Sequence, residues 1–551
     1  MARTYESALS LLSALQSNKA VTSLFSVPIL PSPPASSSQG GSDKSQDLNA
    51  LAIPEMLTWL GRAGLSQSDL AQLKCIHVAG TKGKGSVCAF LTSILVNSSA
   101  VAGKVGTYTS PHLVSVRERI MIDGRPLAPD LFACYFFEVW DAFTEAARAE
   151  LGRKTGDWHS SHSDSFATAR AQAKKEENDR LREAELQGPA TKPFYFRFLT
   201  ILAFHVFLRE GVRSAVVECG IGGEYDSTNV LPAEAVTAGI VTQLGIDHVG
   251  MLGGTLPEIA WHKIGVAKAE RKCFTRRLTG DDGEATMEVL RRRAAELGAE
   301  LVEVPDEAVE AWGGVRAGDV GGLEGGFQKY NQALAVSAAR EHLQILTGPE
   351  QGNASNKSKE AMDFSSLPEG FAEGLRKARL RGRCETRQED NVTWLIDGAH
   401  TAESLQEVAR WFASKRSIAT NTRHVLLFNQ QERDAAKLLE GLYSGIQQNA
   451  PSSSTEAVFD KAVFTRNELQ RRSGDEPERD VAVQNAGAEV LLRLSPESQV
   501  VVCDNVADAV SEVSKIDATE ENAKEKTIVL VTGSLHLVGA LLRTLEPDAP
   551  F

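Results

Sequence analysis

Apolar and polar positions in the first part of the chain follow the pattern of buried strands joined by helices. Apolar, β-branched runs of strand length lie at Leu73 to Val78, Ser214 to Cys219 and Val236 to Thr242, with shorter ones at Lys104 to Thr109 and Arg119 to Ile122. Apolar segments of helical length lie at 1–18, Ile53 to Ala63, Val87 to Val96, Phe194 to Leu208, Met287 to Leu297 and Phe327 to Leu346. Because continuous apolar strands are typical of a parallel sheet covered on both faces, this pattern predicts an α/β domain.

The same alternation resumes after a polar break at about Thr347 to Ser366. Strand-like runs follow at Val392 to Ile396, Val425 to Phe428, Ala462 to Phe464, Val500 to Cys503 and Ile528 to Val531, with helix-like segments between them. They predict a second, smaller α/β domain with a largely parallel sheet. We expect an N-terminal domain at 1–378, with a linker at about 347–378, and a C-terminal domain at 379–551. The charged segment 143–192 lacks an apolar face and is expected to be a surface insertion, partly helical and partly disordered.

Composition adds mainly exclusions to this picture. The 551 residues carry a formal net charge of −13, which argues against general binding to nucleic acid or membrane surfaces but allows a local basic site for an anion. The seven scattered cysteines indicate reduced, buried thiols. No apolar run approaches the roughly 18 residues of a membrane span, and the N-terminus has the pattern of neither a secretory signal nor a transit peptide. We therefore expect a cytoplasmic enzyme, with a mitochondrial form or an inner-membrane or matrix association left open.

The strongest candidate site lies between the first strand and the helix after it. The stretch reads His77-Val-Ala-Gly-Thr-Lys-Gly-Lys-Gly-Ser86. Its glycines let backbone N–H groups face an anion, and the following helix N-terminus adds partial positive charge. The residues expected to hold ATP are Gly80, Thr81, Lys82, Gly83, Lys84, Gly85 and Ser86, with Lys84 on the transferring phosphates and Ser86 offering its hydroxyl to Mg²⁺. Because the order is Gly-Lys-Gly-Ser rather than Gly-Lys-Ser, a plain glycine turn remains the alternative.

Three more polar residues in the first domain are candidates for the same chemistry. Glu218 ends a buried run, where a Mg²⁺ ligand beside such a loop would lie, although a polar strand end is the alternative. His248 follows the next strand, and a structural histidine is its alternative. Lys263 lies among apolar neighbours. It is either a snorkelling lysine or a desolvated amine neutral enough to react, for example with CO₂.

Two turns in the second domain also follow buried strands. One reads Asp397-Gly-Ala-His400, and the other reads Thr532-Gly-Ser-Leu-His536. Each alone could be a strand-to-helix turn with an N-cap. Two of them in one small domain favour a shared ligand site, which α/β proteins place at the carboxyl ends of their strands.

These segments together resemble the folylpolyglutamate synthase family, within the wider group of Mur-type amide ligases. The similarity runs over nearly the whole chain and is to the eukaryotic, fungal-type branch. Besides 77–86, its motifs are Thr109-Ser-Pro-His-Leu113, Glu118-Arg-Ile120, Phe196-Arg-Phe-Leu-Thr200, Glu218-Cys-Gly-Ile-Gly-Gly223, Asp226-Ser-Thr-Asn229, Leu244-Gly-Ile-Asp-His248, Gln328 with Asn331, Gly382-Arg-Cys384, Asp397-Gly-Ala-His-Thr401, Leu427-Phe-Asn429 and Thr532-Gly-Ser-Leu-His-Leu537. The resemblance implies a P-loop central domain of Mur-ligase type and a smaller Rossmann-like domain.

The activity that the resemblance implies is ATP-dependent addition of L-glutamate to the γ-carboxylate of tetrahydrofolate. The product is a poly-γ-glutamate chain, and the reaction passes through an acyl phosphate. The implied partners are tetrahydrofolate and its polyglutamates, L-glutamate and ATP, with Mg²⁺ and room for a monovalent cation such as K⁺. We expect the enzyme to be a monomer.

The resemblance also implies roles for individual residues. Carried over by motif, the Mg²⁺ ligands are Ser86, Glu218 and His248; further ATP contacts are Asn331, Arg383 and Asp397; the folate loop is Thr109, Ser110, Pro111 and His112; the glutamate contacts are His400 and Ser534; and the catalytic residues are Lys84, Lys263 and His400. Lys263 matches the family lysine that is carbamylated. That modification would turn a cation into an anion able to bind metal directly or through water.

The sequence departs from the family in the stretch after Lys263. It reads Ile264-Gly-Val-Ala-Lys268, where the family has Ala-Gly-Ile, an aromatic residue and Lys, followed by a Gly-Val-Pro-Ala strand. Phe327 also stands where the family has His. The altered stretch at 264–278 leaves the local strand and the setting of Lys263 open. The alternatives are therefore a dihydrofolate synthase, which joins glutamate to dihydropteroate, and a nucleotide-binding protein whose ligase activity is lost. A murein-type ligase fits less well, because the folate-loop segment is present.

Overall fold

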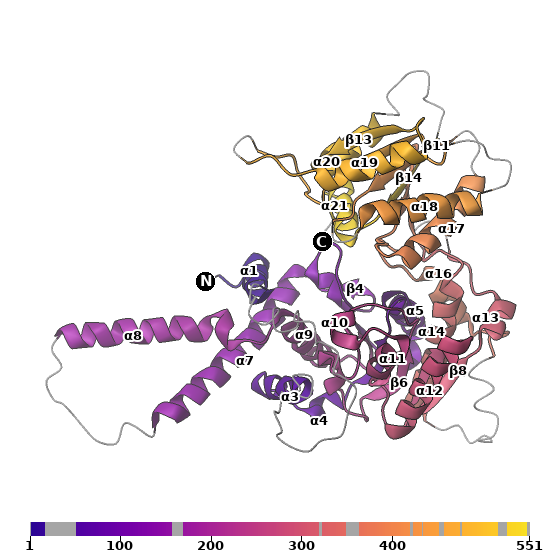
Figure 1. Cartoon of the computed structure of the whole chain (residues 1–551). Helices are drawn as coiled ribbons and strands as arrows, with labels where there is room; N and C mark the ends of the chain where they lie inside the picture. The colour runs from indigo at the N-terminus through magenta and orange to yellow at the C-terminus, as the bar shows by residue number, and fades with distance from the viewer. Residues whose placement is uncertain are drawn as a thin grey trace, which may run out of the picture. The chain divides into compact units, whose positions relative to one another are not determined.

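A computed structural model gives the fold as two compact units, each built on one sheet (Figure 1). The described residues are 2–16, 51–156, 169–318, 322–348, 363–418, 422–431, 434–450, 457–473, 476–515 and 526–547. Unit 1 comprises 1–110, 119–308 and 334–363, and unit 2 comprises 111–118, 309–333 and 364–551. The chain therefore passes between the units several times.

The sheet of unit 1 has eight strands in the order β4-β3-β2-β5-β1-β6-β7-β8. Their bounds are β1 Lys74–Ala79, β2 Val105–Tyr108, β3 Ile120–Ile122, β4 Arg125–Pro126, β5 Ser214–Glu218, β6 Val236–Val241, β7 Lys272–Arg276 and β8 Glu300–Val304. The strands from β2 to β8 in this order run parallel, whereas β3 and β4 return antiparallel at one end. Because β1 pairs with both β5 and β6, the residues that follow these three strands meet at one edge of the sheet.

Helices of unit 1 connect these strands and bury their apolar sides. They are α1 Tyr5–Gln16, α3 Ala52–Arg62, α4 Gln67–Leu70, α5 Lys84–Asn97, α6 Ser99–Ala102, α7 Pro129–Gly156, α8 Ala169–Gln187, α9 Tyr195–Arg209, α10 Val249–Leu252, α11 Leu256–Ile264 and α12 Asp281–Glu296, with 3₁₀ turns η2 Pro189–Thr191 and η3 Ser227–Val230. The 3₁₀ turn η1 Val116–Arg119 begins in unit 2 and ends in unit 1. Helices α11 and α12 lie side by side, and their buried Ile264 and Leu290 share a core with Val241 of β6 and Cys273 of β7 (Figure 1). In the described ranges, no helix is long and apolar enough to cross a membrane.

Unit 2 has a six-stranded sheet in the order β13-β12-β11-β14-β10-β9. Its strands are β9 Glu385–Glu389, β10 Val392–Ile396, β11 Thr422–Phe428, β12 Lys461–Thr465, β13 Gln499–Cys503 and β14 Lys526–Thr532. Its helices are α16 Glu369–Lys377, α17 Ala402–Ile418, α18 Ala435–Asn449, α19 Ala482–Leu494, α20 Val506–Ser514 and α21 Leu535–Leu545. Two further helices, α13 Asp306–Trp312 and α14 Gln328–Thr347, have residues in both units. Only β9 runs antiparallel. Side chains alternate between two cores: Leu395 packs with α17 to α19, and Ile396 packs with α20 and α21.

This architecture confirms the α/β class predicted from the hydrophobic pattern. The strands expected in the second half all form, and β10 has the expected bounds. Strand β7 forms within the altered stretch at 264–278, because Cys273 and Phe274 are buried there in the parallel ladder. Strands β4, β8 and β9 were not expected; β8 and β9 are rich in exposed or charged positions and carry little apolar signal.

The predicted start of the surface insertion at residue 143 is too early in the chain. Residue 143 lies inside α7, and the Phe143 side chain is fully buried, with its ring centroid 5.6 Å from that of Trp59. At the other end Lys192 is also buried, and its Nζ lies 4.8 Å from the centroid of the Trp140 ring. Helix α8 supplies the expected helical part, and residues 157–168 lie outside the described residues.

The compact units also divide the chain differently from the expected boundary at 378/379. Residues 364–378 belong to unit 2, where the Phe364 ring stacks on Trp312 with centroids 4.9 Å apart. Residues 111–118 belong to the same unit. Leu113 packs closely against Gly539, because a Cβ added to that glycine would lie 2.3 Å from the Leu113 carbonyl oxygen. Much of the expected linker, 349–362, lies outside the described residues. The pattern of apolar runs does not register such short excursions of the chain.

Candidate active site

The Gly-rich loop joins β1 to α5 at the carboxyl edge of the unit 1 sheet. Gly80 has φ 147°, and a Cβ there would lie 1.8 Å from Oγ1 of Thr242. The N–H groups of Thr81 and Lys82 donate to the Gln243 carbonyl at 3.0 and 3.1 Å. The loop after β6 therefore holds the loop after β1. Helix α5 begins at Lys84 behind Gly83, which has φ 85°, so its first N–H groups and Ser86 suit a phosphate.

Two lysines converge on one backbone oxygen of this loop. Lys84 Nζ donates to the Gly80 carbonyl at 3.1 Å, and Lys263 Nζ donates to the same oxygen at 2.9 Å. Lys263 comes from α11 and is 3% exposed. Burial, reinforced by the nearby Lys84 charge, lowers the pKa of Lys263 to about 8. A sizeable fraction of this amine is therefore neutral near physiological pH.

Glu218 is a buried carboxylate at the same edge, and His248 is more exposed. Glu218 ends β5 opposite Val78 of β1 and accepts from the Ser110 N–H at 3.1 Å. His248 has φ 51°, its side chain is 47% exposed, and its Nε2 lies 3.8 Å from Asp247 Oδ2. The structure thus brings Glu218 to the strand edge beside the Gly-rich loop and leaves His248 on a left-handed turn before α10.

The donor set at this edge suits Mg²⁺ that arrives with a nucleotide. Within the described residues, no group of three or more His, Cys, Asp and Glu side chains is arranged to hold a metal by itself. Mg²⁺ commonly binds one or two carboxylates together with substrate phosphates and water. The buried Glu218 carboxylate and the Ser86 hydroxyl in the first turn of α5 match that preference.

The expected folate loop is divided between the two units. Thr109 and Ser110 belong to unit 1, and the Thr109 N–H donates to the Arg119 carbonyl at 3.0 Å. Pro111 and His112 belong to unit 2, together with the segment that ends at Glu118. The Glu118 carboxylate accepts from three consecutive N–H groups, those of residues 113–115, at 2.7 to 2.9 Å.

In unit 2, the Asp397 carboxylate is buried and engaged by backbone. Its two oxygens accept from the N–H groups of Cys384 and Ala399, each at 2.8 Å. Burial raises the pKa of Asp397, while the nearby Arg383 guanidinium lowers it. Cys384 has φ 44°, a strained backbone conformation, and Asp397 stabilises this turn through the Cys384 N–H. The turn carries Arg383 and lies against a second turn, which leads to His400. His400 Nδ1 in turn donates to the Gly398 carbonyl at 2.9 Å.

The remaining expected residues of unit 2 also have protein partners. Ser534 is the N-cap of α21, and its Oγ accepts from the N–H groups of His536 and Leu537 at 3.1 and 3.5 Å. Asn331 is buried, and its Nδ2 donates to Gln328 Oε1 at 2.8 Å. The Ser534 hydroxyl keeps its own proton available as a donor.

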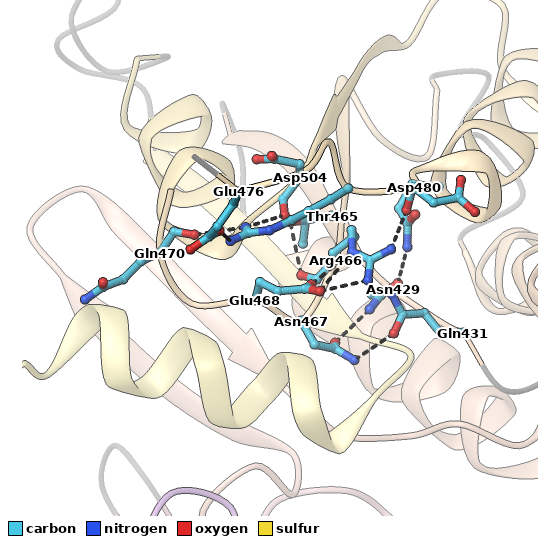
Figure 2. A network of polar contacts seen from close by, with 12 residues as sticks. Asn429, Gln431, Thr465, Arg466, Asn467, Glu468, Gln470, Glu476, Asp480 and Asp504 are labelled. Atoms are coloured by element: carbon cyan, nitrogen blue, oxygen red, sulfur yellow. Dashed lines mark hydrogen bonds and ion pairs between the residues drawn. The ribbon is translucent and has the colours of Figure 1, made fainter. Parts of the chain in front are cut away.

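A polar network follows β11 and β12 at the carboxyl edge of the unit 2 sheet. Figure 2 shows Asn467 bonded to both Asn429 and Gln431: Asn429 Nδ2 donates to Asn467 Oδ1 at 2.7 Å, and Asn467 Nδ2 donates to Gln431 Oε1 at 3.4 Å. Beside it, Arg466 binds the Glu468 carboxylate at 2.8 to 3.1 Å. Of this network, only Asn429 belongs to a motif named from the sequence. The other residues also follow buried strands, so their position in the sequence could have indicated them.

Sequence reasoning also missed the residues that fix the Gly-rich loop. Thr242 and Gln243 directly follow β6, and the Thr242 hydroxyl donates to the Lys82 carbonyl at 2.7 Å. The rule that selected Glu218, a polar residue at the end of a buried strand, applies equally to Thr242. Neutral side chains did not draw attention because they lack obvious chemistry.

Comparisons with curated relatives and with solved structures cover most of the chain, and a family model matches part of unit 2. A family model described as "Dihydrofolate synthetase, C-terminal domain" matches residues 380–449. Folylpolyglutamate synthases of Saccharomyces cerevisiae are similar: that of strain FostersO is 36% identical over 548 residues, covering 98% of this chain and 86% of the relative, and that of strain S288c is 36% identical over 552 residues with the same coverage.

Solved structures share the fold at lower identity. Mycobacterium tuberculosis folylpolyglutamate synthase complexed with ADP and AMPPCP has a TM-score of 0.60 at 23% identity, covering 91% of this chain and 96% of that one. E. coli FolC in complex with DHPP and ADP has a TM-score of 0.55 at 20% identity, covering 90% of this chain and 98% of that one. These structures support the two-sheet α/β architecture.

Proposed function

This chain belongs to the folylpolyglutamate synthase family, and from that premise we propose how its residues perform the reaction. The family reaction is ATP-dependent ligation of glutamate to folate. A carboxylate is a poor acyl donor, so we infer that the γ-phosphoryl group of ATP is first moved onto the γ-carboxylate of tetrahydrofolate. The amine of L-glutamate then attacks this acyl phosphate, the carbonyl passes through a tetrahedral intermediate, and phosphate leaves.

Positioning and charge neutralisation dominate the first step. In this proposal the loop Gly80 to Ser86 holds the ATP phosphates, and Lys84 exchanges the Gly80 carbonyl for a phosphate oxygen. Ser86 and Glu218, with His248, would hold Mg²⁺, which when bound neutralises phosphate charge. Asn331, Arg383 and Asp397 are proposed as further ATP contacts, with the buried Asp397 acting by fixing the turn that carries Arg383.

Lys263 is proposed to work as a carbamate. A lysine whose pKa is lowered to about 8 supplies the neutral amine that attacks CO₂, releasing a proton and giving an anionic carbamate. Conversion of this cation into an anion removes the repulsion with Lys84 and provides oxygens for metal or bound water. A monovalent cation such as K⁺ belongs to the same proposal.

The two organic substrates are assigned to the remaining residues. Thr109, Ser110, Pro111 and His112 form the proposed folate loop, in which the Ser110 N–H already donates to Glu218. His400 and Ser534 take the incoming glutamate: Ser534 Oγ–H is a free-rotating donor at the start of α21, and His400 Nδ1–H is fixed by the Gly398 carbonyl. His400 therefore keeps its other ring nitrogen for the substrate.

The observation that carries this proposal is the convergence of Lys84 and Lys263 on the Gly80 carbonyl beside the buried Glu218 carboxylate. The Lys84 cation at a helix N-terminus fits a polyphosphate, the buried Lys263 amine beside it fits a carbamate, and a carboxylate at the neighbouring strand end fits the metal. We further propose that the enzyme acts as a monomer in the cytoplasm.

The test is mass spectrometry of tetrahydrofolate incubated with the protein, Mg-ATP and L-glutamate. A ladder of added glutamyl units, absent with Lys84→Ala, is expected. Conversion of dihydropteroate to dihydrofolate without a ladder would favour the dihydrofolate synthase alternative, to which the description of the family model at 380–449 also points. ATP binding with neither product would mean that the ligase activity is lost.

A further inference from the structure

We propose that the turn Asp226 to Asn229 is the positioning element of this site. Hydrogen bonds made by Asp226 and Thr228 (the Thr228 arm) fix the position of Glu218, and hydrogen bonds made by Asn229 (the Asn229 arm) fix the position of Lys263. The inference rests on the proposed function, because it concerns the placement of two residues that the reaction uses. The turn contains η3 and follows β5 in sequence. Its four residues form one of the sequence motifs described above, and the proposed reaction gives none of them a role.

The first arm begins with the Asp226 carboxylate, which grips the loop directly after Glu218. Asp226 Oδ2 accepts from the N–H groups of Gly220 and Ile221 at 2.9 and 3.1 Å. On its other side this loop has no spare room, because a Cβ on Gly220 would lie 2.6 Å from the Phe196 ring. The backbone two residues beyond the proposed metal carboxylate is therefore clamped from both sides.

Thr228 extends this arm to β1, the strand that leads into the Gly-rich loop. Its hydroxyl donates to Asp226 Oδ1 at 2.6 Å, so it accepts from the Nε2–H of His77 at 2.8 Å. Cys219 Sγ lies 3.1 Å from the same nitrogen. Burial lowers the pKa of His77 to about 3, so the ring is neutral and carries one proton, consistent with an Nε2–H donor. This series of hydrogen bonds links the loop after β5 to β1.

The second arm is the Asn229 side chain, which reaches the end of α11. Its Nδ2 donates to the carbonyl oxygens of Gly265 and Glu224 at 3.1 and 3.0 Å. Its Oδ1 accepts from Lys268 Nζ at 2.9 Å. Gly265 is the C-cap of α11, two residues beyond Lys263, so Asn229 fixes the helix end from which that lysine projects.

Close backbone approach makes this second arm short and rigid. The Glu224 N–H donates to the His262 carbonyl at 2.7 Å. A Cβ on Gly223 would lie 2.7 Å from the carbonyl oxygens of both His262 and Lys263. The glycine loop after Glu218 therefore lies directly against the last turn of α11. One short turn thus sets the distance between a carboxylate on a strand and a lysine on a helix.

The two arms predict separable defects. Thr228→Val keeps the shape but removes the hydroxyl, so Mn²⁺ binding in the presence of ADP, measured by electron paramagnetic resonance, should weaken about tenfold or more. Thr228→Ser should restore it. Asn229→Ala should weaken Mn²⁺ binding less than Thr228→Val does and lower kcat for glutamate addition about tenfold or more, with KM for ATP unchanged. Lys268→Met should reproduce the Asn229→Ala defect.

Ser227→Ala is the matched control in the same turn, because the Ser227 side chain makes no hydrogen bond within the described residues. The control should change neither measurement. Equal effects of Thr228→Val and Asn229→Ala on both measurements, or effects on thermal stability alone, would overturn the two-arm proposal. If Thr228→Val does not fold, failure of Thr228→Ser to retain normal Mn²⁺ binding would overturn it. Wild-type protein without any ligation would instead contradict the proposed function, while the Mn²⁺ measurement would still decide the Thr228 arm.

Discussion

The two sheets end in similar parallel edges, but the edges carry opposite arrangements of charge. At the unit 1 edge, Lys84 and Lys263 both donate to one carbonyl, and within the described residues neither ammonium is bonded to a carboxylate. At the unit 2 edge the polar side chains are bonded to groups of the protein: Asp397 accepts two backbone N–H groups. Arg466 binds Glu468 (Figure 2).

This difference shows that strand-edge position alone does not define an anion site. Parallel sheets place loops at their carboxyl edges in both units, as α/β proteins commonly do. At the unit 1 edge, Lys84 has a weak, exchangeable partner, a neutral carbonyl, which a phosphate can replace. The unit 2 edge uses its polar groups on one another, and such satisfied networks fix the backbone.

The largest expected effect comes from removing the first lysine. Lys84→Ala should lower kcat/KM for ATP about 10³-fold, because neutralising the charge of the transferring phosphates contributes much of the catalysis in such reactions. Steady-state ADP release with tetrahydrofolate and glutamate measures it. Lys104→Ala, which removes a surface ion pair with Glu210 in the same unit, is the control and should be near wild type. Equal activity of the two variants would contradict the distinction between the edges.

An isosteric pair of substitutions compares the two buried carboxylates directly. Glu218→Gln should lower activity about 10²-fold while the free energy of unfolding hardly falls, since its proposed partner is a metal. Asp397→Asn should lower the free energy of unfolding by about 1–3 kcal/mol, because the amide cannot accept from both Cys384 and Ala399 without leaving a buried donor unmatched. Urea unfolding and ADP release measure the two effects. The reverse ranking in either assay would refute the assignment of roles.

The depressed pKa of Lys263 predicts a specific pH dependence of stability. Its ordinary pKa is about 10.4, and in the folded protein it is about 8. Between these values the unfolded chain binds more protons than the folded one, so the free energy of unfolding must rise with pH across this window. Urea unfolding from about pH 7.5 to about pH 10 in bicarbonate-free buffer should show this rise relative to Lys263→Met. A flat or falling difference would mean that the lysine is not desolvated.

The smallest expected effect lies in the polar network of unit 2. Asn467→Ala removes the acceptor of Asn429 Nδ2 and should lower the free energy of unfolding by about 1 kcal/mol, leaving kcat unchanged. Urea unfolding and ADP release measure this. A large loss of kcat with normal stability would show that this network contacts a substrate.

The charged residues of the proposed site were easier to select from the sequence than the residues that hold them. Lys84 and Glu218 could be proposed because a strand, a glycine loop and a helix, or a buried strand with a polar end, are visible as local patterns. The burial of Lys263 could not be read, because it depends on the glycine loop after β5 packing against α11. The excursion of 111–118 into unit 2 was equally invisible, since it depends on the close approach of Leu113 to Gly539. The roles of Arg383, His400 and Ser534 came from the family resemblance alone.

The most direct test of the central claim follows the oxygen atoms of the folate γ-carboxylate. Tetrahydrofolate labelled with ¹⁸O in that group is incubated with the protein, Mg-ATP and L-glutamate, and the released phosphate is analysed by mass spectrometry. Phosphoryl transfer to the carboxylate at the Gly80-to-Ser86 edge predicts one ¹⁸O atom in phosphate for each glutamate added. Glutamate addition with unlabelled phosphate would contradict the acyl phosphate and with it the role assigned to this edge.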